Sequence, residues 1–422
     1  MRNRAISFLL LFFVFITAVK AQTKEEPKKE ESKFSINVTG YVKTDILLDT
    51  RQNYALREGH FLLYPIGETK DAEGNDVFEK TNFNILPIQT RFNAKMTGPD
   101  AFSAKTSAVV EAEFFGTTDA DINGFRLRHA FIKMDWDKTS LLFGQTWHPM
   151  FIAEMFPAVV SFNTGVPFIP FARSPQIRLT HSFGDASIMA ALIAQRDFAS
   201  NGPSGFTSSY MRNAVIPNTH IQFQYKSGEN LFGFAGDYKI LMPRTLTTKN
   251  IKTSETISSM AALGFMKVKL DPVTFKVQGI YGQNLSDLLM LGGYAVKSTN
   301  TTTAEETYTN ISSYSVWGEL LTGKEIETGI FFGYSKYLGA ADNITGASYI
   351  NRLDAADKGK AIDNVFRVAP RVQFNSGKMR FSAELEYTSA GYGTPVNNDM
   401  GKVKDITSVA NIRLLLAAWY FF

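Results

Sequence analysis

The feature that most constrains this chain is a period-two alternation of apolar and polar residues. In residues 34–49 the apolar side chains fall on one face of an extended chain and the polar side chains on the other. The apolar face carries Phe34, Ile36, Val38, Val42, Ile46 and Leu48. Because successive side chains of a β-strand point to opposite faces, we predict a strand with one apolar and one polar side.

The next two segments show the same alternation with more contrast. Residues 88–96 and 104–114 alternate between apolar or small residues and polar ones, and Gly98-Pro99-Asp100 turns the chain between them. This arrangement predicts a β-hairpin. A half-buried sheet in a soluble β-sandwich would alternate in the same way, so the pattern alone leaves both architectures open.

The lengths of the connections distinguish the two architectures. Seven connections are short and turn-like: 98–102, 137–139, 184–185, 227–230, 270–272, 322–324 and 375–378. Eight are longer: 50–82, 116–124, 148–175, 197–217, 242–255, 285–312, 337–362 and 389–406. Short and long connections alternate strictly, as in outer-membrane barrels, which have short turns at one end and long loops at the other. The sequence therefore predicts an all-β fold, a 16-stranded antiparallel transmembrane β-barrel.

The predicted strands have the length of tilted membrane strands, typically about 9–11 residues. They are 34–49, 83–97, 103–115, 125–136, 140–147, 176–183, 186–196, 218–226, 231–241, 256–269, 273–284, 313–321, 325–336, 363–374, 379–388 and 407–422. The barrel must close, because an open sheet edge in lipid would leave backbone groups unpaired.

The C-terminal segment, NIRLLLAAWYFF, has no polar tail. Its lipid-facing side is predicted to be Ile412, Leu414, Leu416, Ala418, Tyr420 and Phe422. We expect this strand to pair with the first strand and to place its aromatic end in an interfacial girdle. A strand ending on an aromatic residue such as Phe422 also resembles the sorting signal of the barrel-assembly machinery, which is therefore an expected partner.

The N-terminus has the features of a secretory signal peptide. Arg2 and Arg4 precede an apolar run of fifteen residues, and small residues surround a cleavage site after Ala21. A membrane-spanning helix is the alternative, but it needs about 20 residues. Residues 22–33 are all charged or polar apart from one proline, Pro27. We therefore expect a flexible spacer before a barrel of residues 34–422.

Charge and composition exclude other classes of function. Without residues 1–21 the chain has 41 basic and 40 acidic residues, and this balance does not indicate a nucleic-acid partner. The chain has no cysteine, and its five histidines show no metal-ligand spacing, so no metal and no cofactor are expected. No catalytic residues are predicted, because the sequence has no nucleophile elbow or comparable motif.

The long connection 148–175 is unusual for a solvated loop, because it is rich in Phe, Pro and Met and its only charges are Glu154 and Arg173. We expect it to fold into the barrel as a constriction, with Phe151, Glu154, Phe156 and Arg173 as its functional residues. An outer flap or a subunit contact is the alternative.

Two stretches carry a resemblance to a known family. FRLRHAFIKMDWDKTSLLFGQTWHPMF (125–151) and FARSPQIRLTHSF (171–183) resemble the DcaP-like family among the trimeric porins of Gram-negative outer membranes. The resemblance implies a homotrimer in which the loop after strand five narrows the pore and small, often anionic, solutes pass. This chain lacks the heptad-bearing N-terminal extension of that family.

Basic residues on the polar faces of the predicted strands support an anion pathway. They are Arg91, Lys95, Lys105, Arg178, Arg367, Arg371, Arg380 and Arg413, which we predict to line the pore. Arg126 and Arg128 are added to this set, although they share a phase with apolar residues; a β-bulge or a position above the lipid band would resolve this. The alternative is that these arginines merely balance Glu111, Glu113, Glu384 and Glu386 across the wall.

The function predicted from the sequence is passive diffusion of small hydrophilic solutes, carboxylates in particular, across the bacterial outer membrane. The alternatives are a channel selective for phosphate or for hydrophobic solutes, and a surface adhesin without an open pore.

Overall fold

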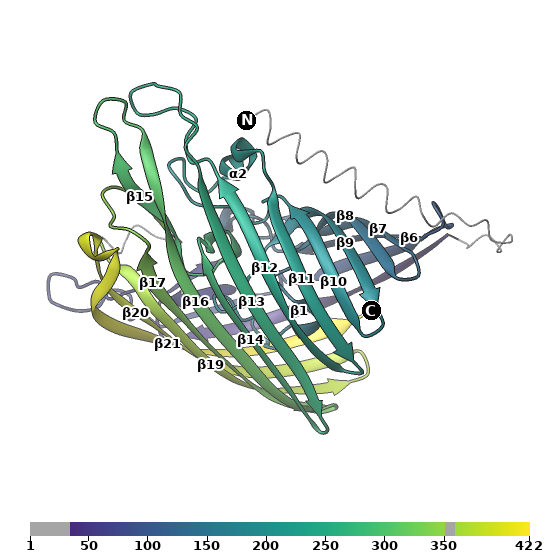
Figure 1. Cartoon of the computed structure of the whole chain (residues 1–422). Coiled ribbons are helices and arrows are strands. Elements are labelled where there is room, and N and C mark those ends of the chain that lie inside the picture. Colours follow the sequence, from purple (N-terminus) through teal and green to yellow (C-terminus); the bar gives the residue numbers. More distant parts are fainter. Residues whose placement is uncertain (1–33, 351–358) are drawn as a thin grey trace.

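The computed structural model describes residues 34–350 and 359–422. The predicted signal peptide (1–21) and spacer (22–33) lie outside the described residues. One large antiparallel sheet closes on itself as a barrel of sixteen strands (Figure 1), as predicted. In chain order the wall contains β1 (Ser35–Asp49), β4 (Asn82–Leu86) continued by β5 (Arg91–Thr97), β6 (Lys105–Phe114), β7 (Phe125–Asp135), β8 (Thr139–Trp147), β9 (Arg173–Phe183), β10 (Ala186–Ile193), β11 (Asn218–Ser227), β12 (Asn230–Leu241), β13 (Ile257–Leu270), β14 (Val273–Gln283), β16 (Glu306–Gly323), β17 (Ile326–Ala340), β19 (Ala361–Ser376), β20 (Met379–Val396) and β21 (Lys402–Phe421).

The first and last strands form the seam of the barrel. They pair antiparallel from Tyr41 opposite Phe421 to Asp49 opposite Arg413. Tyr41 and Phe421 also make an edge-to-face ring contact. The prediction that the apolar C-terminal segment pairs with the first strand is therefore confirmed.

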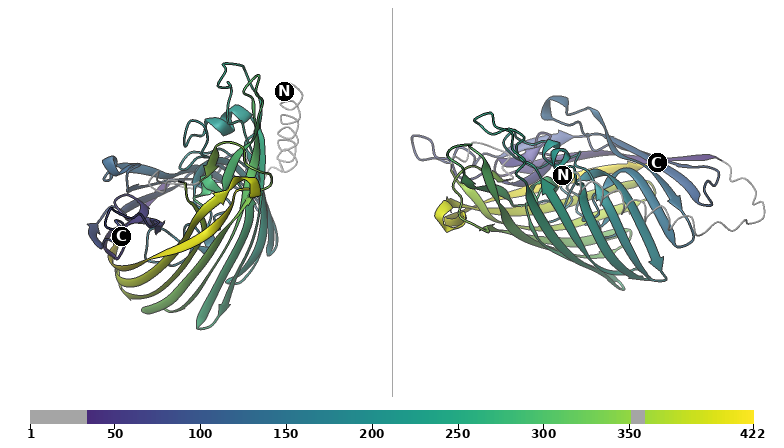
Figure 2. Two further views of the ribbon diagram at one scale, coloured as in Figure 1. Left: turned by 90° about the vertical axis from the view of Figure 1, so that its left-hand side faces the viewer. Right: turned by 45° about the horizontal axis from the view of Figure 1, so that its top comes forward.

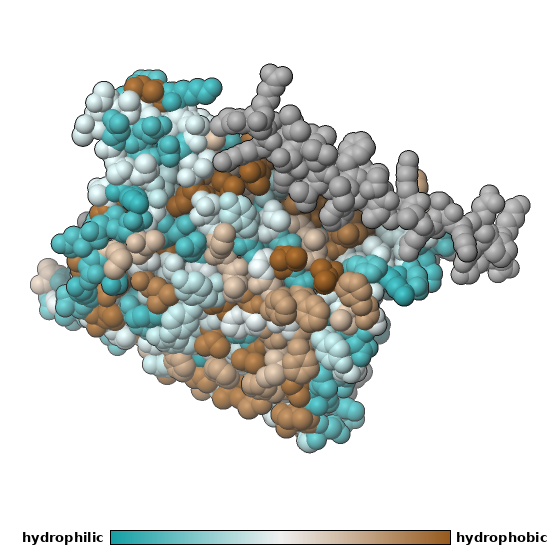
Figure 3. All heavy atoms as spheres, in the orientation of Figure 1, coloured by the Kyte–Doolittle hydropathy of each residue, from teal (hydrophilic) through white to brown (hydrophobic). Residues whose placement is uncertain are grey.

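The alternating residues of each strand point to the outer face of the barrel and to its interior in turn. In β21 the outward side chains Ile412, Leu414 and Leu416 are exposed, whereas the inward Arg413 and Leu415 are buried. Figure 3 shows apolar residues over the strand-covered part of one face and polar residues over the loops. An apolar outer face around a polar interior is what a bilayer requires of a closed barrel.

The height of the wall varies around the barrel. Strands β8 and β10 have 9 and 8 residues, whereas β20 and β21 have 18 and 20. Figures 1 and 2 show the taller wall formed by the later strands. We refer to the end with the short connections as the turn end and to the other as the loop end.

The strands extend further into the loops than the sequence predicted. β16 begins at Glu306 instead of residue 313, and β21 begins at Lys402 instead of residue 407. The loops also contain strands of their own: β2 (Asn53–Leu56), β3 (Phe61–Pro65), β15 (Gly293–Thr299) and β18 (Ser348–Ile350). Beyond the bilayer both faces of a strand meet water or other loops, so the alternation that revealed the strands disappears there.

Helical structure is sparse in the part of the chain that is described. The one α-helix, α2 (Ser209–Ala214), follows β10, and 3₁₀ turns cover 119–121, 153–155, 286–288 and 397–399. No helix among the described residues is long and apolar enough to cross a membrane.

Candidate functional site: two cavities joined by an arginine cluster

The connection between β8 and β9, residues 148–172, folds into the barrel. Most of its apolar side chains are almost completely buried there, although Phe156 is 43 % exposed. They include Met150, Phe151, Ile152, Met155, Val160, Phe162, Val166, Phe168, Ile169 and Phe171. The predicted inward fold of this loop is confirmed, and we call residues 148–172 the inward loop.

Side chains of the wall bind the backbone of the inward loop. The amides of Val160 and Ser161 donate to the carboxylate of Glu384 at 2.7 and 3.1 Å, and Lys43 donates to the carbonyl oxygen of Val160 at 2.8 Å. The amide of Ala158 donates to Glu319 at 2.7 Å. Because a loop buried in a barrel cannot bond to bulk water, it needs such partners.

The first long connection also enters the barrel, which the sequence did not predict. Residues 61–64, in the apolar stretch FLLYP, are at most 2 % exposed. Arg367 donates to the carbonyl oxygens of Leu63 and Val166, each at 2.7 Å, and so binds this connection and the inward loop together. The apolar run in an otherwise polar connection was the signal that could have indicated this burial.

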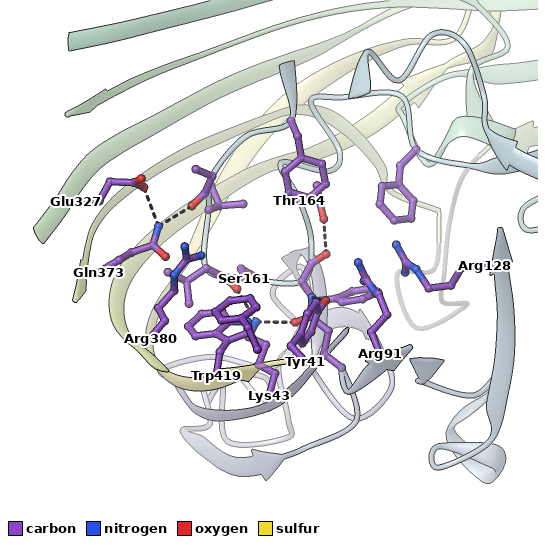
Figure 4. Close-up of a pocket in the computed structure, with 18 of the residues that line it drawn as sticks. Tyr41, Lys43, Arg91, Arg128, Ser161, Thr164, Glu327, Gln373, Arg380 and Trp419 are labelled. Carbon is purple, nitrogen blue, oxygen red and sulfur yellow. Dashed lines mark hydrogen bonds between the residues drawn. The ribbon is translucent and has the colours of Figure 1, made fainter. Parts of the chain in front are cut away.

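A cavity of about 380 Å³, which we call the turn-side cavity, lies between the inward loop and the turn end. Its charged lining is mainly basic: Lys43, Arg91, Arg128 and Arg380, with Glu327 as the one acid. Aromatic rings complete the wall, and the guanidinium of Arg380 lies 5.9 Å from the ring centre of Trp419. Figure 4 shows Arg91 and Arg128 side by side, with Arg380 approaching from the opposite wall.

A second cavity of about 350 Å³, the loop-side cavity, lies at the loop end. It is lined by Leu56, Arg57, Thr117, Arg126, Arg196, Asp197, Phe198, Ala199, Phe206, Ser286 and Leu289. All but Arg126 belong to long connections. Burial and the neighbouring Arg126 lower the pKa of Arg57 to about 10, which leaves its guanidinium charged at neutral pH.

An arginine cluster connects the two cavities. Glu113, fully buried on β6, accepts hydrogen bonds from Arg91 at 2.8 Å, from Arg126 at 2.9 Å and from Arg128 at 2.6 Å. Arg173 lies 3.8 Å from the same carboxylate. Since Arg126 lines the loop-side cavity and Arg91 and Arg128 line the turn-side cavity, one carboxylate binds basic groups of both.

Two further carboxylates contact the arginine cluster. Glu111 accepts from Arg128 at 2.7 Å, and Asp197 lies 2.6 Å from Arg173. These ion pairs hold the guanidinium groups in fixed orientations, as expected for hydrogen-bonded charges in a buried network.

A β-bulge explains how Arg126 and Arg128 both face inward. Glu111 pairs with His129 and the next residue, Ala112, pairs with Leu127, so Arg128 is the extra residue on β7. Leu127, between the two arginines, is 49 % exposed on the outer face. Of the explanations considered for this strand, the bulge is therefore the one present, and it turns the side chain of Arg128 into the barrel.

Three other predicted basic residues pair with acids of the wall. Arg371 lies 2.8 Å from Glu319, Arg413 lies 2.7 Å from Asp49, and Arg367 lies 3.3 Å from Glu386. All three arginines are at most 5 % exposed. These three arginines therefore balance acids across the wall, which is the alternative raised from the sequence.

The remaining predicted basic residues have no acidic partner within 4.0 Å in the described ranges. Arg380 donates to the side-chain oxygen of Asn375, and Arg178 donates to Gln176 and to the carbonyl oxygen of Trp147. Lys95 and Lys105 are exposed towards the turn end and line neither cavity.

The four residues chosen in the inward loop differ in position. Phe151 stacks on Trp147 with ring centres 4.1 Å apart, Phe156 lines the turn-side cavity, and the exposed Glu154 pairs with Lys226. The prediction that Arg173 belongs to the loop was wrong. Arg173 is the first residue of β9, because its backbone pairs with that of Trp147 in β8.

Sequence analysis missed several cavity residues. Lys43 was not among the predicted pore-lining residues, although it donates to Gln89 and to the inward loop. Arg57 and Asp197 lie in long connections, where no periodicity assigns a direction to a side chain. Arg196 was the last residue of the predicted strand 186–196, but β10 ends at Ile193, so Arg196 also lies in a connection. Within residues 34–350 and 359–422, no group of three or more His, Asp or Glu side chains is arranged to hold a metal ion.

Comparison of the sequence with family models gave no match, and comparison with curated protein sequences gave none. Several solved structures share the fold. The outer membrane channel DcaP of Acinetobacter baumannii has 14% sequence identity and a TM-score of 0.65, covering 94% of this chain and 100% of that one.

Two further porin-like barrels are similar over nearly the whole chain. The trimer form of OmpT of Vibrio cholerae has 10% identity and a TM-score of 0.53, covering 93% of this chain and 100% of that one. The anion-selective porin from Comamonas acidovorans has 9% identity and a TM-score of 0.52, covering 92% and 100%. The chain therefore has the fold of Gram-negative porins.

Proposed function

We propose that this protein is a porin for small hydrophilic anions, carboxylates in particular, which diffuse passively through a basic lumen narrowed by the inward loop. The observation that carries the proposal is the arginine cluster on Glu113, which presents fixed guanidinium groups to a cavity on each side. Guanidinium groups match the geometry of carboxylates and raise the local concentration of anions.

The excess of basic over acidic residues in the arginine cluster and the two cavities supports selectivity for anions. The arginine cluster contains four arginines, Arg91, Arg126, Arg128 and Arg173, against three acids, Glu111, Glu113 and Asp197. The turn-side cavity adds Lys43, Arg380 and the acid Glu327, and the loop-side cavity adds Arg57 and Arg196. The lining therefore carries a net positive charge along both cavities.

The proposal includes a homotrimer that is exported by its signal peptide, inserted by the barrel-assembly machinery and free of catalytic activity. The trimer form of OmpT of Vibrio cholerae, which has a similar fold, supports the oligomeric state. The terminal Phe422, whose ring lies 5.5 Å from that of Phe92 on the outer face, is the residue that we expect the assembly machinery to recognise.

Single-channel recording of the mature protein in planar bilayers tests this proposal. We expect conductance steps in groups of three and a reversal potential on the anion side in a potassium chloride gradient. Arg380→Gln is the informative variant, because Arg380 has no acid within 4.0 Å in the described part of the chain and its loss leaves no unpaired carboxylate.

We expect Arg380→Gln to lower the chloride-to-potassium permeability ratio about twofold. Lys378→Gln, which removes an exposed charge in the neighbouring turn, is the matched control and should leave the ratio unchanged. Cation selectivity of the unmodified protein, or the absence of any conductance, would overturn the proposal.

A further inference from the structure

The loop-side cavity contains basic groups that the acids of the wall do not neutralise. Its single acid, Asp197, accepts a hydrogen bond at 2.8 Å from Arg173, which lies outside the cavity lining, and lies 3.7 Å from Nη1 of Arg126. Arg126 donates a hydrogen bond from Nη2 to Glu113. Its Nε is buried without a hydrogen-bond partner in the described residues.

The guanidinium of Arg57 has only neutral hydrogen-bond partners, while the backbone amide of Arg57 donates to the carboxylate of Asp119 at 2.7 Å. Its Nε and Nη2 donate to the carbonyl oxygens of Phe115 and Gly116 at 3.0 and 3.3 Å, and no hydrogen bond to another described residue uses Nη1. The guanidinium groups of Arg57 and Arg126 lie 5.3 and 4.7 Å from the ring centre of Phe115. Two positive groups thus share one aromatic ring, an arrangement that favours a bound anion.

Arg196 adds a third cation at this cavity. Its side chain is exposed, and it makes no hydrogen bond or ion pair with any residue that the structure describes. A guanidinium without a partner keeps all five of its donors available for a ligand.

The rest of the lining is apolar. Leu56, Phe198, Phe206 and Leu289 line the cavity, and Phe206 is 51 % exposed. Phe198 packs on Phe171 of the inward loop with ring centres 6.2 Å apart, which fixes one side of the wall. The volume of about 350 Å³ is at the lower end of the range for small-molecule sites.

We propose that the loop-side cavity is a saturable binding site for an organic carboxylate with an apolar body. Arg57 and Arg196 bind the carboxylate, and Phe198 and Phe206 contact the body. The inference rests on the proposed function and deepens it, because it makes the channel selective by binding before the arginine cluster is reached. Inorganic phosphate fits less well, since it would leave the apolar wall without contacts.

Calorimetric titration of the purified full-length mature protein in detergent measures this binding without conduction. The probes are acetate, butyrate, hexanoate and inorganic phosphate. We expect affinity to rise roughly two- to fourfold with each added methylene, so that hexanoate binds at least about tenfold more tightly than acetate. Phosphate should bind no more tightly than acetate.

Two variants assign the binding to this cavity. Arg196→Gln should weaken hexanoate binding about three- to tenfold, because one charged donor is lost at a partly solvated site. Arg212→Gln is the matched control, since Arg212 is also exposed and without an ion pair in the described chain, but lies in α2 outside the cavity lining. Phe206→Ser should reduce the dependence of the affinity on chain length, because Phe206 contacts the apolar body of the ligand.

Equal hexanoate affinity in Arg196→Gln and Arg212→Gln would overturn the inference, as would affinity independent of chain length. Bilayer recording separates this outcome from failure of the proposed function. A protein that conducts anions without saturable hexanoate binding keeps the proposed function and loses the site. A protein that binds hexanoate through Arg196 but does not conduct keeps the site and loses the proposed function.

Discussion

Arg128 Nη1 lies 2.6 Å from Oε1 of Glu113, and both side chains are buried inside the barrel. Glu113 sits at the point where the linings of the two cavities meet. It also binds Arg91 and Arg126, so removing its charge affects more than one ion pair.

Glu113→Gln should therefore destabilise the barrel and increase anion selectivity. Loss of the carboxylate leaves the guanidinium groups with one negative charge fewer, and breaking a buried ion pair costs about 3–5 kcal/mol of unfolding free energy. Urea unfolding in lipid vesicles and the reversal potential measure the two effects.

Glu154→Gln is the control for this variant. Glu154 is exposed and pairs with the exposed Lys226, so its loss should cost less than about 1 kcal/mol. Equal stabilities for the two variants would show that the arginine cluster does not depend on Glu113.

Gly333→Ala tests whether the inward loop controls the conductance. A Cβ at residue 333 on β17 would overlap the ring of Phe168, and the carbonyl oxygen of Phe168 accepts a hydrogen bond from Ser315 at 3.0 Å. We expect the loop to shift, with an altered single-channel conductance, more current noise and a loss of about 1–3 kcal/mol of stability.

Gly264→Ala provides the comparison, because a Cβ there would meet no atom within 4 Å. It should reproduce the unmodified conductance. If Gly333→Ala also conducts like the unmodified protein, the position of the inward loop does not set the pore size.

Leu414→Arg tests the assignment of the outer face. Leu414 points outward from β21 and is 41 % exposed, so arginine there would face hydrocarbon. An arginine near the bilayer midplane costs about 2–4 kcal/mol. The measurement is the unfolding free energy in vesicles.

Ser408→Arg, on the same face of β21 but six residues nearer the loop end, should cost about 0–1 kcal/mol. The same loss at both depths would contradict the placement of Leu414 within the bilayer.

Asp76 gives a pH-dependent anchor to the first long connection. It lies 2.6 Å from Arg51. Burial raises the pKa of Asp76, but Arg51 and the backbone amides of Phe78 and Thr69 outweigh burial and hold the pKa below its usual range. A carboxyl group with a depressed pKa stabilises the fold above its unfolded pKa of about 3.9 and loses this contribution as pH falls through its folded pKa.

Asp76→Asn should therefore increase the rate of protease cleavage within residues 50–81 at pH 7. The difference from the unmodified protein should shrink as pH falls below about 3.9 and vanish below the depressed folded pKa of Asp76, where both proteins carry a neutral side chain at residue 76. A difference that persists unchanged at pH 3, measured with an acid-stable protease, would contradict an electrostatic role.

The wall of the barrel was predictable because lipid on one side and a polar lumen on the other impose the same alternation on every strand. Val42, Lys43 and Asp45 already show it in β1, and each side chain lies where the alternation predicts. The inward loop was predictable for a related reason, since residues such as Phe162 and Phe168 would not face water together.

The arginine cluster was only partly predictable. Arg128 needed a bulge to reach the lumen, and the pattern of β7 indicated that irregularity without fixing its position. Arg57 and Arg196 reach the loop-side cavity through the folding of long connections. Their directions depend on contacts such as that of Arg57 with the carbonyl oxygen of Phe115, for which the local sequence carries no period.

The pairing of β1 with β21 has a consequence for how the protein matures. Partners at this seam, such as Leu48 and Leu414, are separated by almost the entire chain. Pairs so distant in sequence are costly to bring together and form slowly. Closure must therefore wait until translation and export have delivered the last strand. Until then β1 and the last strand added to the sheet each present an unpaired edge, so a chain released early would be prone to aggregate before it reached the membrane.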